Sequence, residues 1–139
     1  MKYILHYGIT AIIFFAIDIL WLGFLGRPIY KKFIGHLMSP EVNWGSALVF
    51  YGLFILGILI FAVYPAISQG SLKYAAMYGA HFGFFTYMTY ELTNHAVIKD
   101  WPFGIVPIDI IWGTVLSCAV AVGSYYAAGW LSLKSPSLF

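Results

Sequence analysis

The sequence predicts an all-α integral membrane protein, with four transmembrane helices in an up-and-down bundle and a short interfacial amphipathic helix between helices 1 and 2. Hydrophobic residues make up 62% of the 139 residues and charged residues only 9%, which lies far outside the range of a water-soluble domain. The apolar residues gather in four stretches, each long enough to supply the roughly 20 residues that a spanning helix needs. Because four spans leave no length for a separate soluble domain, we expect a single transmembrane domain over residues 1–139.

The predicted spans cover residues 4–25, 46–67, 72–97 and 105–130. The longest connection follows the first span, where apolar residues recur at helical spacing from Pro28 to Met38, opposite Lys31, Lys32 and His36. This pattern predicts an amphipathic helix that lies in the membrane interface. Ser39-Pro40 then predicts its end.

Three acidic residues, Asp18, Glu91 and Asp109, lie inside predicted spans. In an up-and-down chain, the end of span 1, the end of span 3 and the start of span 4 meet the same membrane surface. At a rise of 1.5 Å per residue, the three acids lie roughly 6 to 10 Å below that surface. A carboxylate at the bilayer centre costs about 3 kcal/mol on insertion scales, so an acid within a span marks a candidate functional site.

Aromatic and amide side chains accompany these acids at the spacing of one helical turn. The pentapeptide at residues 17–21 recurs almost unchanged at residues 108–112, so each aspartate is followed by a tryptophan three positions later. On span 3, the helical period places a tyrosine and an asparagine on the face of Glu91, with a second tyrosine at its margin. The candidate residues for ligand or proton binding are Asp18, Trp21, Tyr87, Tyr90, Glu91, Asn94, Asp109 and Trp112.

Small residues at intervals of four predict close packing between spans 3 and 4. This arrangement lets the backbones of two membrane helices approach each other. The two ridges consist of Ala75, Gly79 and Gly83 on span 3, and of Gly113, Ser117 and Ala121 on span 4.

The acids favour a site that binds or transports a proton or a small cationic molecule. Three carboxylates in one leaflet would repel one another if all were charged, so at least one should be protonated or neutralised by a bound cation. Two alternatives stay open. In one, the acids serve as general acid and base in a membrane-embedded, lipid-modifying enzyme. In the other, they only lock helices together in a structural or assembly subunit of a membrane complex.

Other polar residues give weaker signals. Glu91 and His95 have an i,i+4 spacing that could contribute to a metal site, but we predict no metal, and no cofactor can be assigned. His81 could relay protons, although a histidine among aromatic residues is more often a packed neutral ring. Trp101 and Tyr30 fit an aromatic belt at the membrane surface. The expected partners are the lipid bilayer, a small cationic or lipid ligand and a second copy that completes a cavity; the formal charge of +2 does not indicate nucleic acid.

Several motifs together resemble a family of small bacterial membrane proteins, the domain-of-unknown-function 2177 family. The motifs are Asp18 to Trp21, Arg27-Pro28-Ile29-Tyr30, Phe50-Tyr51, Tyr64-Pro65-Ala66, Thr89-Tyr90-Glu91-Leu92-Thr93-Asn94, Trp101-Pro102 and Asp109 to Gly113. The resemblance covers nearly the whole chain and implies a four-span protein of the bacterial inner (cytoplasmic) membrane, without implying an activity. Members more often have Asp at the position of Glu91, and an apolar residue at those of His81 and His95.

Overall fold

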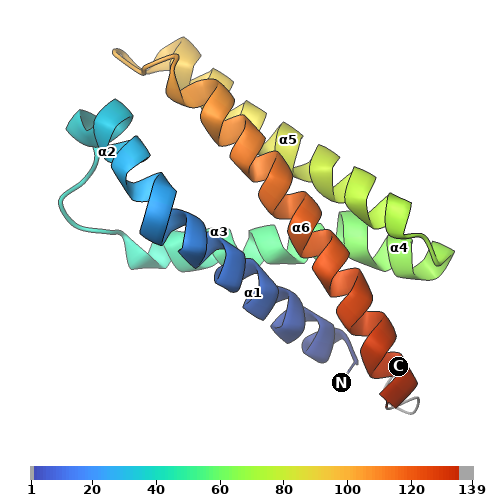
Figure 1. The fold of residues 1–139 in the computed structure, drawn as a ribbon. Coiled ribbons are helices and arrows are strands. Elements are labelled where there is room, and N and C mark those ends of the chain that lie inside the picture. Colours follow the sequence, from blue (N-terminus) through green and yellow to red (C-terminus); the bar gives the residue numbers. More distant parts are fainter. Residues whose placement is uncertain (1, 135–139) are drawn as a thin grey trace.

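The computed structural model describes residues 2–134, which form an all-α membrane protein (Figure 1). Residues 1 and 135–139 of the expected domain lie outside this part. Three helical segments in the described part are long and apolar enough to cross a membrane: Lys2–Leu37, Trp44–Gln69 and Ile105–Ser132. The remaining long helix, α5 (Leu72–Val97), has 26 residues and therefore sufficient length, but its histidines, threonines and glutamate lower its hydropathy. The fourth span thus remains a prediction.

The first segment bends where the sequence analysis expected a helix to end. Helix α1 (Lys2–Trp21) continues through a π-helical turn, η1 (Leu22–Gly26), into α2 (Arg27–Ile34) and a short 3₁₀ turn, η2 (Gly35–Leu37). Pro28, which has no amide hydrogen to donate to the preceding turn, follows η1 by two residues. The wider π turn accommodates the missing donor, so the helix continues instead of breaking.

The second segment repeats this arrangement. Helix α3 (Trp44–Ile58) passes through a second π turn, η3 (Leu59–Val63), into α4 (Tyr64–Gln69), and Pro65 again follows the π turn by two residues. The segment begins where the Asn43 side chain accepts a hydrogen bond from the Ser46 amide, 3.1 Å away. It ends at Gly70, whose φ of +59° is the left-handed conformation that glycine adopts readily.

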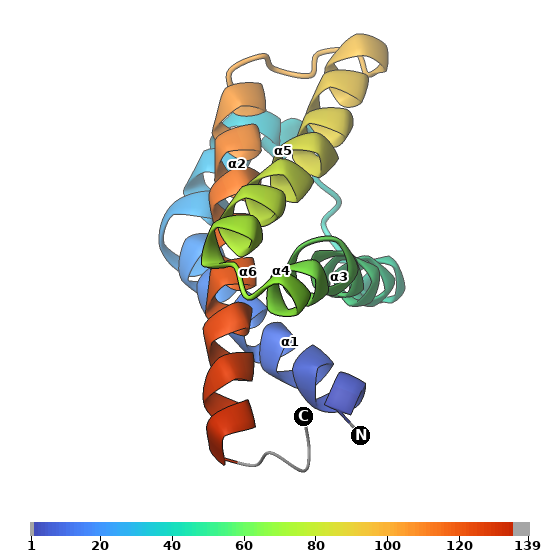
Figure 2. The same ribbon diagram turned by 90° about the vertical axis from the view of Figure 1, so that its right-hand side faces the viewer.

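The helices alternate in direction along the chain (Figures 1 and 2). Helices α1 and α5 run one way, while α3–α4 and α6 (Ile105–Lys134) run the other way. Figure 2 views α3 nearly along its axis while α6 stands upright, so α3 crosses α6 at a steep angle. The end of α2 and the start of α6 lie near the top of both views, whereas α3 starts near mid-height.

The predicted close packing of spans 3 and 4 is confirmed by the contact between α5 and α6. A Cβ atom added to Gly83 would lie 2.0 Å from the Gly113 carbonyl oxygen, and one added to Gly79 would lie 2.7 Å from the Ser117 carbonyl oxygen. All six residues of the two small-residue ridges are buried. An apolar core around Phe14, Ile58 and Leu116 joins α1 and α3 to α6.

A methyl group at Gly83 should disrupt this contact. We expect Gly83→Ala to lower the free energy of unfolding by about 1–3 kcal/mol, the range for overpacking a tightly packed site. Gly8→Ala is the matched control, because an added Cβ there meets no atom within 4 Å. Unfolding in mixed micelles, followed by tryptophan fluorescence, measures both variants. Equal stabilities would contradict the close approach of α5 and α6.

Candidate functional site

The three predicted acids are buried, and each accepts a hydrogen bond from a neutral donor on another part of the chain. Asp18, Glu91 and Asp109 are only 7%, 1% and 6% exposed. The donors are Tyr51, Trp101 and Tyr30, respectively. A buried carboxyl without such a partner would carry a large desolvation cost.

Helix α2 supplies the partner of Asp109. The Tyr30 hydroxyl donates to Asp109 Oδ1 over 2.5 Å and accepts a hydrogen bond from Trp21 Nε1 over 3.3 Å. The bend at η1 brings Tyr30 back over the start of α6, so α1, α2 and α6 meet in one hydrogen-bonded chain. Sequence analysis assigned Tyr30 to an aromatic belt and did not predict this contact.

Trp21 and Trp112, which the pentapeptide repeat paired with the two aspartates, pack against each other. Their rings are stacked with centroids 4.3 Å apart and an interplanar angle of 8°. The repeat therefore brings α1 and α6 together through its tryptophans. The hydrogen bonds to the aspartates come instead from Tyr30 and Tyr51.

Asp18 lies on the α3 side of α1. Its Oδ2 atom accepts a hydrogen bond from the Tyr51 hydroxyl over 3.3 Å. Tyr87 on α5 is within electrostatic range of both Asp18 and Asp109. Asp18 does not line the cavity that Glu91 and Asp109 share.

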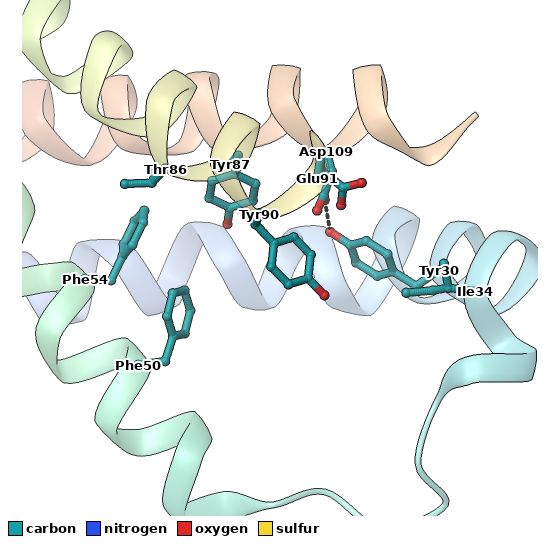
Figure 3. A pocket seen from close by; sticks show the side chains of 9 residues that line it. All are labelled: Tyr30, Ile34, Phe50, Phe54, Thr86, Tyr87, Tyr90, Glu91 and Asp109. Carbon is teal, nitrogen blue, oxygen red and sulfur yellow. Dashed lines mark hydrogen bonds between the residues drawn. The ribbon is translucent and has the colours of Figure 1, made fainter. Parts of the chain in front are cut away.

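A cavity of about 470 Å³ lies among α2, α3, α5 and the start of α6 (Figure 3). Its lining consists of Tyr30, Ile34, Phe50, Phe54, Thr86, Tyr87, Tyr90, Glu91 and Asp109. Most of this surface is aromatic, and the two carboxyl groups are its only charged groups. Phe50 and Tyr90 are 48% and 53% exposed, so the cavity opens laterally between α3 and α5.

Glu91 and Asp109 lie beside each other on the side of the cavity formed by α5 and α6 (Figure 3). The two residues come from different helices, Glu91 from α5 and Asp109 from α6. Trp101, in the connection between α5 and α6, donates its indole hydrogen to Glu91 Oε2 over 3.0 Å and packs its ring edgewise against Tyr90. The buried Trp101 ring thus covers the carboxyl pair on the side facing this connection.

Three other polar residues of α5, Asn94, His81 and His95, lie at the margin of the cavity or outside it. Asn94 is partly buried and its side chain interacts with that of Tyr90. His81 is exposed and its Nδ1 contacts the Met77 carbonyl oxygen, 2.6 Å away on the same helix. His95 is exposed beside Phe103. Neither histidine accompanies Glu91 into the cavity.

Sequence analysis missed the part of the lining that comes from α2 and α3. Ile34, Phe50 and Phe54 belong to helices that carry no acid within the predicted spans, and their positions depend on the bend at η1 and on the tilt of α3. Thr86 lies one residue before Tyr87 and therefore outside the face assigned to Glu91. The motif Phe50-Tyr51 was the one available signal, since it is part of the resemblance to a known family.

Loss of the Tyr30 hydroxyl should destabilise the fold, because Asp109 and the Trp21 indole both lose a partner. We expect Tyr30→Phe to lower the free energy of unfolding by about 1–3 kcal/mol. The control is Tyr126→Phe, since Tyr126 is 58% exposed. In a double-mutant cycle with Asp109→Asn, additive effects would contradict a direct contact between Tyr30 and Asp109.

Comparison with known proteins identifies a family without an assigned activity. A family model described as a predicted membrane protein (DUF2177) matches residues 3–126. No curated protein and no solved structure matches the chain. The matched region includes every residue of the cavity lining and all three buried acids. The chain therefore belongs to the DUF2177 family of predicted membrane proteins.

Proposed function

We propose that the protein binds a small lipophilic cation in the aromatic cavity and releases a proton from the Glu91 and Asp109 pair as it does so. The observation that carries this proposal is the placement of two carboxyl groups beside each other in a cavity lined mainly by aromatic side chains. Two unit charges 4 Å apart repel by about 4 kcal/mol at an effective dielectric of 20. A proton held by the pair, or a cation bound beside it, removes this repulsion.

The size and lining of the cavity suit an organic cation. Its volume of about 470 Å³ falls within the range of small-molecule sites. The faces of Tyr30, Tyr87 and Tyr90 can contact a cation, and each such contact contributes about 0.5–2 kcal/mol. The carboxyl pair supplies charge, while the aromatic walls supply apolar contact.

The lateral opening gives such a cation a route from the lipid. A lipophilic cation concentrates in the membrane, and the exposed Phe50 and Tyr90 border the entrance. The cavity lies within one chain, so this proposal does not require a second copy. We also propose that the protein belongs to the bacterial inner membrane, in agreement with the motifs described above.

The lateral opening also supports a second candidate, a lipid-modifying enzyme in which Glu91 and Asp109 act as general acid and base. A lipid chain could enter between α3 and α5 and bring a headgroup to the carboxyl pair. The two candidates differ in their product. An enzyme changes the lipid composition of a membrane, whereas a cation-binding protein leaves it unchanged.

Binding and proton release can be measured together on purified protein. We expect tetraphenylphosphonium to bind in isothermal titration calorimetry and to release close to one proton per ligand, read in buffers of different ionisation enthalpy. Because cation and proton compete, the affinity should rise as the pH is raised. Asp109→Asn and Glu91→Gln should weaken binding about tenfold or more and abolish the proton release.

The control variant is Glu41→Gln, which removes an exposed acid in the connection before α3. It should bind as the wild type does. The neutral triphenylphosphine oxide is the control ligand and should release no proton. Equal affinity and proton release in wild type and Asp109→Asn would overturn the proposal, and altered lipid profiles that require Glu91 would favour the enzyme.

A further inference from the structure

A second hollow, which Tyr30 also lines, lies at the bend of the first helical segment. It has a volume of about 380 Å³ and is lined by Ile19, Leu22, Gly23, Arg27, Tyr30 and Met38. The missing side chain at Gly23 contributes to the depression, and the chain after α2 folds back so that Met38 closes one edge. This hollow is separate from the acidic cavity, and only Tyr30 lines both.

Arg27 is the one charged residue of this hollow. It is exposed, and the structure gives its guanidinium no acidic partner among residues 2–134. Lys31 follows by one helical turn on the same face of α2 and is also exposed. The bend therefore presents a cluster of positive charge directly beside an apolar depression.

Apart from Tyr30, the rest of the lining is apolar or glycine and is exposed. Ile19 and Met38 are 64% and 53% exposed, and Leu20, which precedes the bend on the outer face of α1, is 60% exposed. In a membrane this surface contacts lipid. Arg27 follows the end of α1, whose 20 residues are about the length of a membrane span, so we expect Arg27 near the level of the lipid headgroups. Positive charge at headgroup level above an apolar groove matches the two ends of a phospholipid.

We propose that this hollow is a binding site for an anionic phospholipid, with its phosphate on Arg27 and an acyl chain along Ile19 and Leu22. A guanidinium can form two parallel hydrogen bonds to a phosphate, which an ammonium group cannot do. Lys31 adds attraction for a headgroup with net negative charge. The site would thus distinguish phosphatidylglycerol from phosphatidylcholine, whose choline cancels the phosphate charge.

Occupancy of this site would also reach the acidic cavity through Tyr30. The same ring that borders the lipid hollow donates its hydroxyl hydrogen to Asp109. A lipid held against α1 and α2 fixes the bend between them and with it the position of Tyr30. Bound lipid therefore stabilises the contact between α2 and α6.

The test compares lipid binding in the full-length protein by native mass spectrometry from micelles supplied with defined lipids. Wild type should retain phosphatidylglycerol about tenfold more strongly than phosphatidylcholine. Arg27→Gln should remove this preference, and Arg27→Lys should keep part of it because the charge remains. Inorganic phosphate should not compete, since it lacks an acyl chain.

The matched control is Lys73→Gln, which removes an exposed positive charge at the start of α5, far along the helix from Glu91. It should leave the lipid preference unchanged. Equal retention of both lipids by wild type would overturn the proposal, as would a preference that survives Arg27→Gln. Competition by inorganic phosphate alone would identify an anion site instead of a lipid site. Thermal stability of each variant in lipid-free detergent shows whether any loss reflects unfolding.

Discussion

The arrangement of the helices depends on hydrogen bonds to three buried carboxyl groups. In an apolar environment each carboxyl needs a donor, and here every donor comes from another element. Asp18 on α1 binds α3 through Tyr51, and Asp109 on α6 binds α2 through Tyr30. Glu91 on α5 binds the connection to α6. The acids therefore help to determine which helices meet at this end of the molecule, together with an apolar cluster of Trp101, Ile105 and Val106.

The two π-helical turns change the path of the helices that carry or face these hydrogen-bond donors. Each precedes a proline by two residues, at Pro28 and at Pro65. A proline inside a regular helix removes one hydrogen bond and clashes with the preceding turn, so the chain must adjust nearby. At η1 the adjustment redirects α2 while keeping the segment helical, and it brings Tyr30 to Asp109. π turns often occur at functional sites, and here one of them positions a residue of the candidate site.

The sequence could predict the features that depend on one helix at a time. The all-α membrane fold follows from composition, and the ridges on α5 and α6 follow from spacing, because both are periodic along the chain. The partners of the acids do not follow in this way. Tyr30 and Trp101 lie at the ends of apolar stretches, where an aromatic belt is the usual interpretation, and only the bend and the helix crossings bring them inward. Trp21 and Trp112 lie one turn from the aspartates, as the repeat predicted, and their rings also stack on each other, which the spacing alone does not predict.

The nature of the donors bears on what the site can do. Phenol and indole groups satisfy the hydrogen bonds of a carboxyl but bring no positive charge. A lysine or arginine in place of these phenol and indole donors would neutralise the charge of Glu91 or Asp109 permanently. No bound cation would then be needed to balance that charge. With neutral partners, the charge of the pair must be balanced by something that can leave, either a proton or a bound cation. Arg27 lines the other hollow, so no lysine or arginine lines the cavity that contains Glu91 and Asp109.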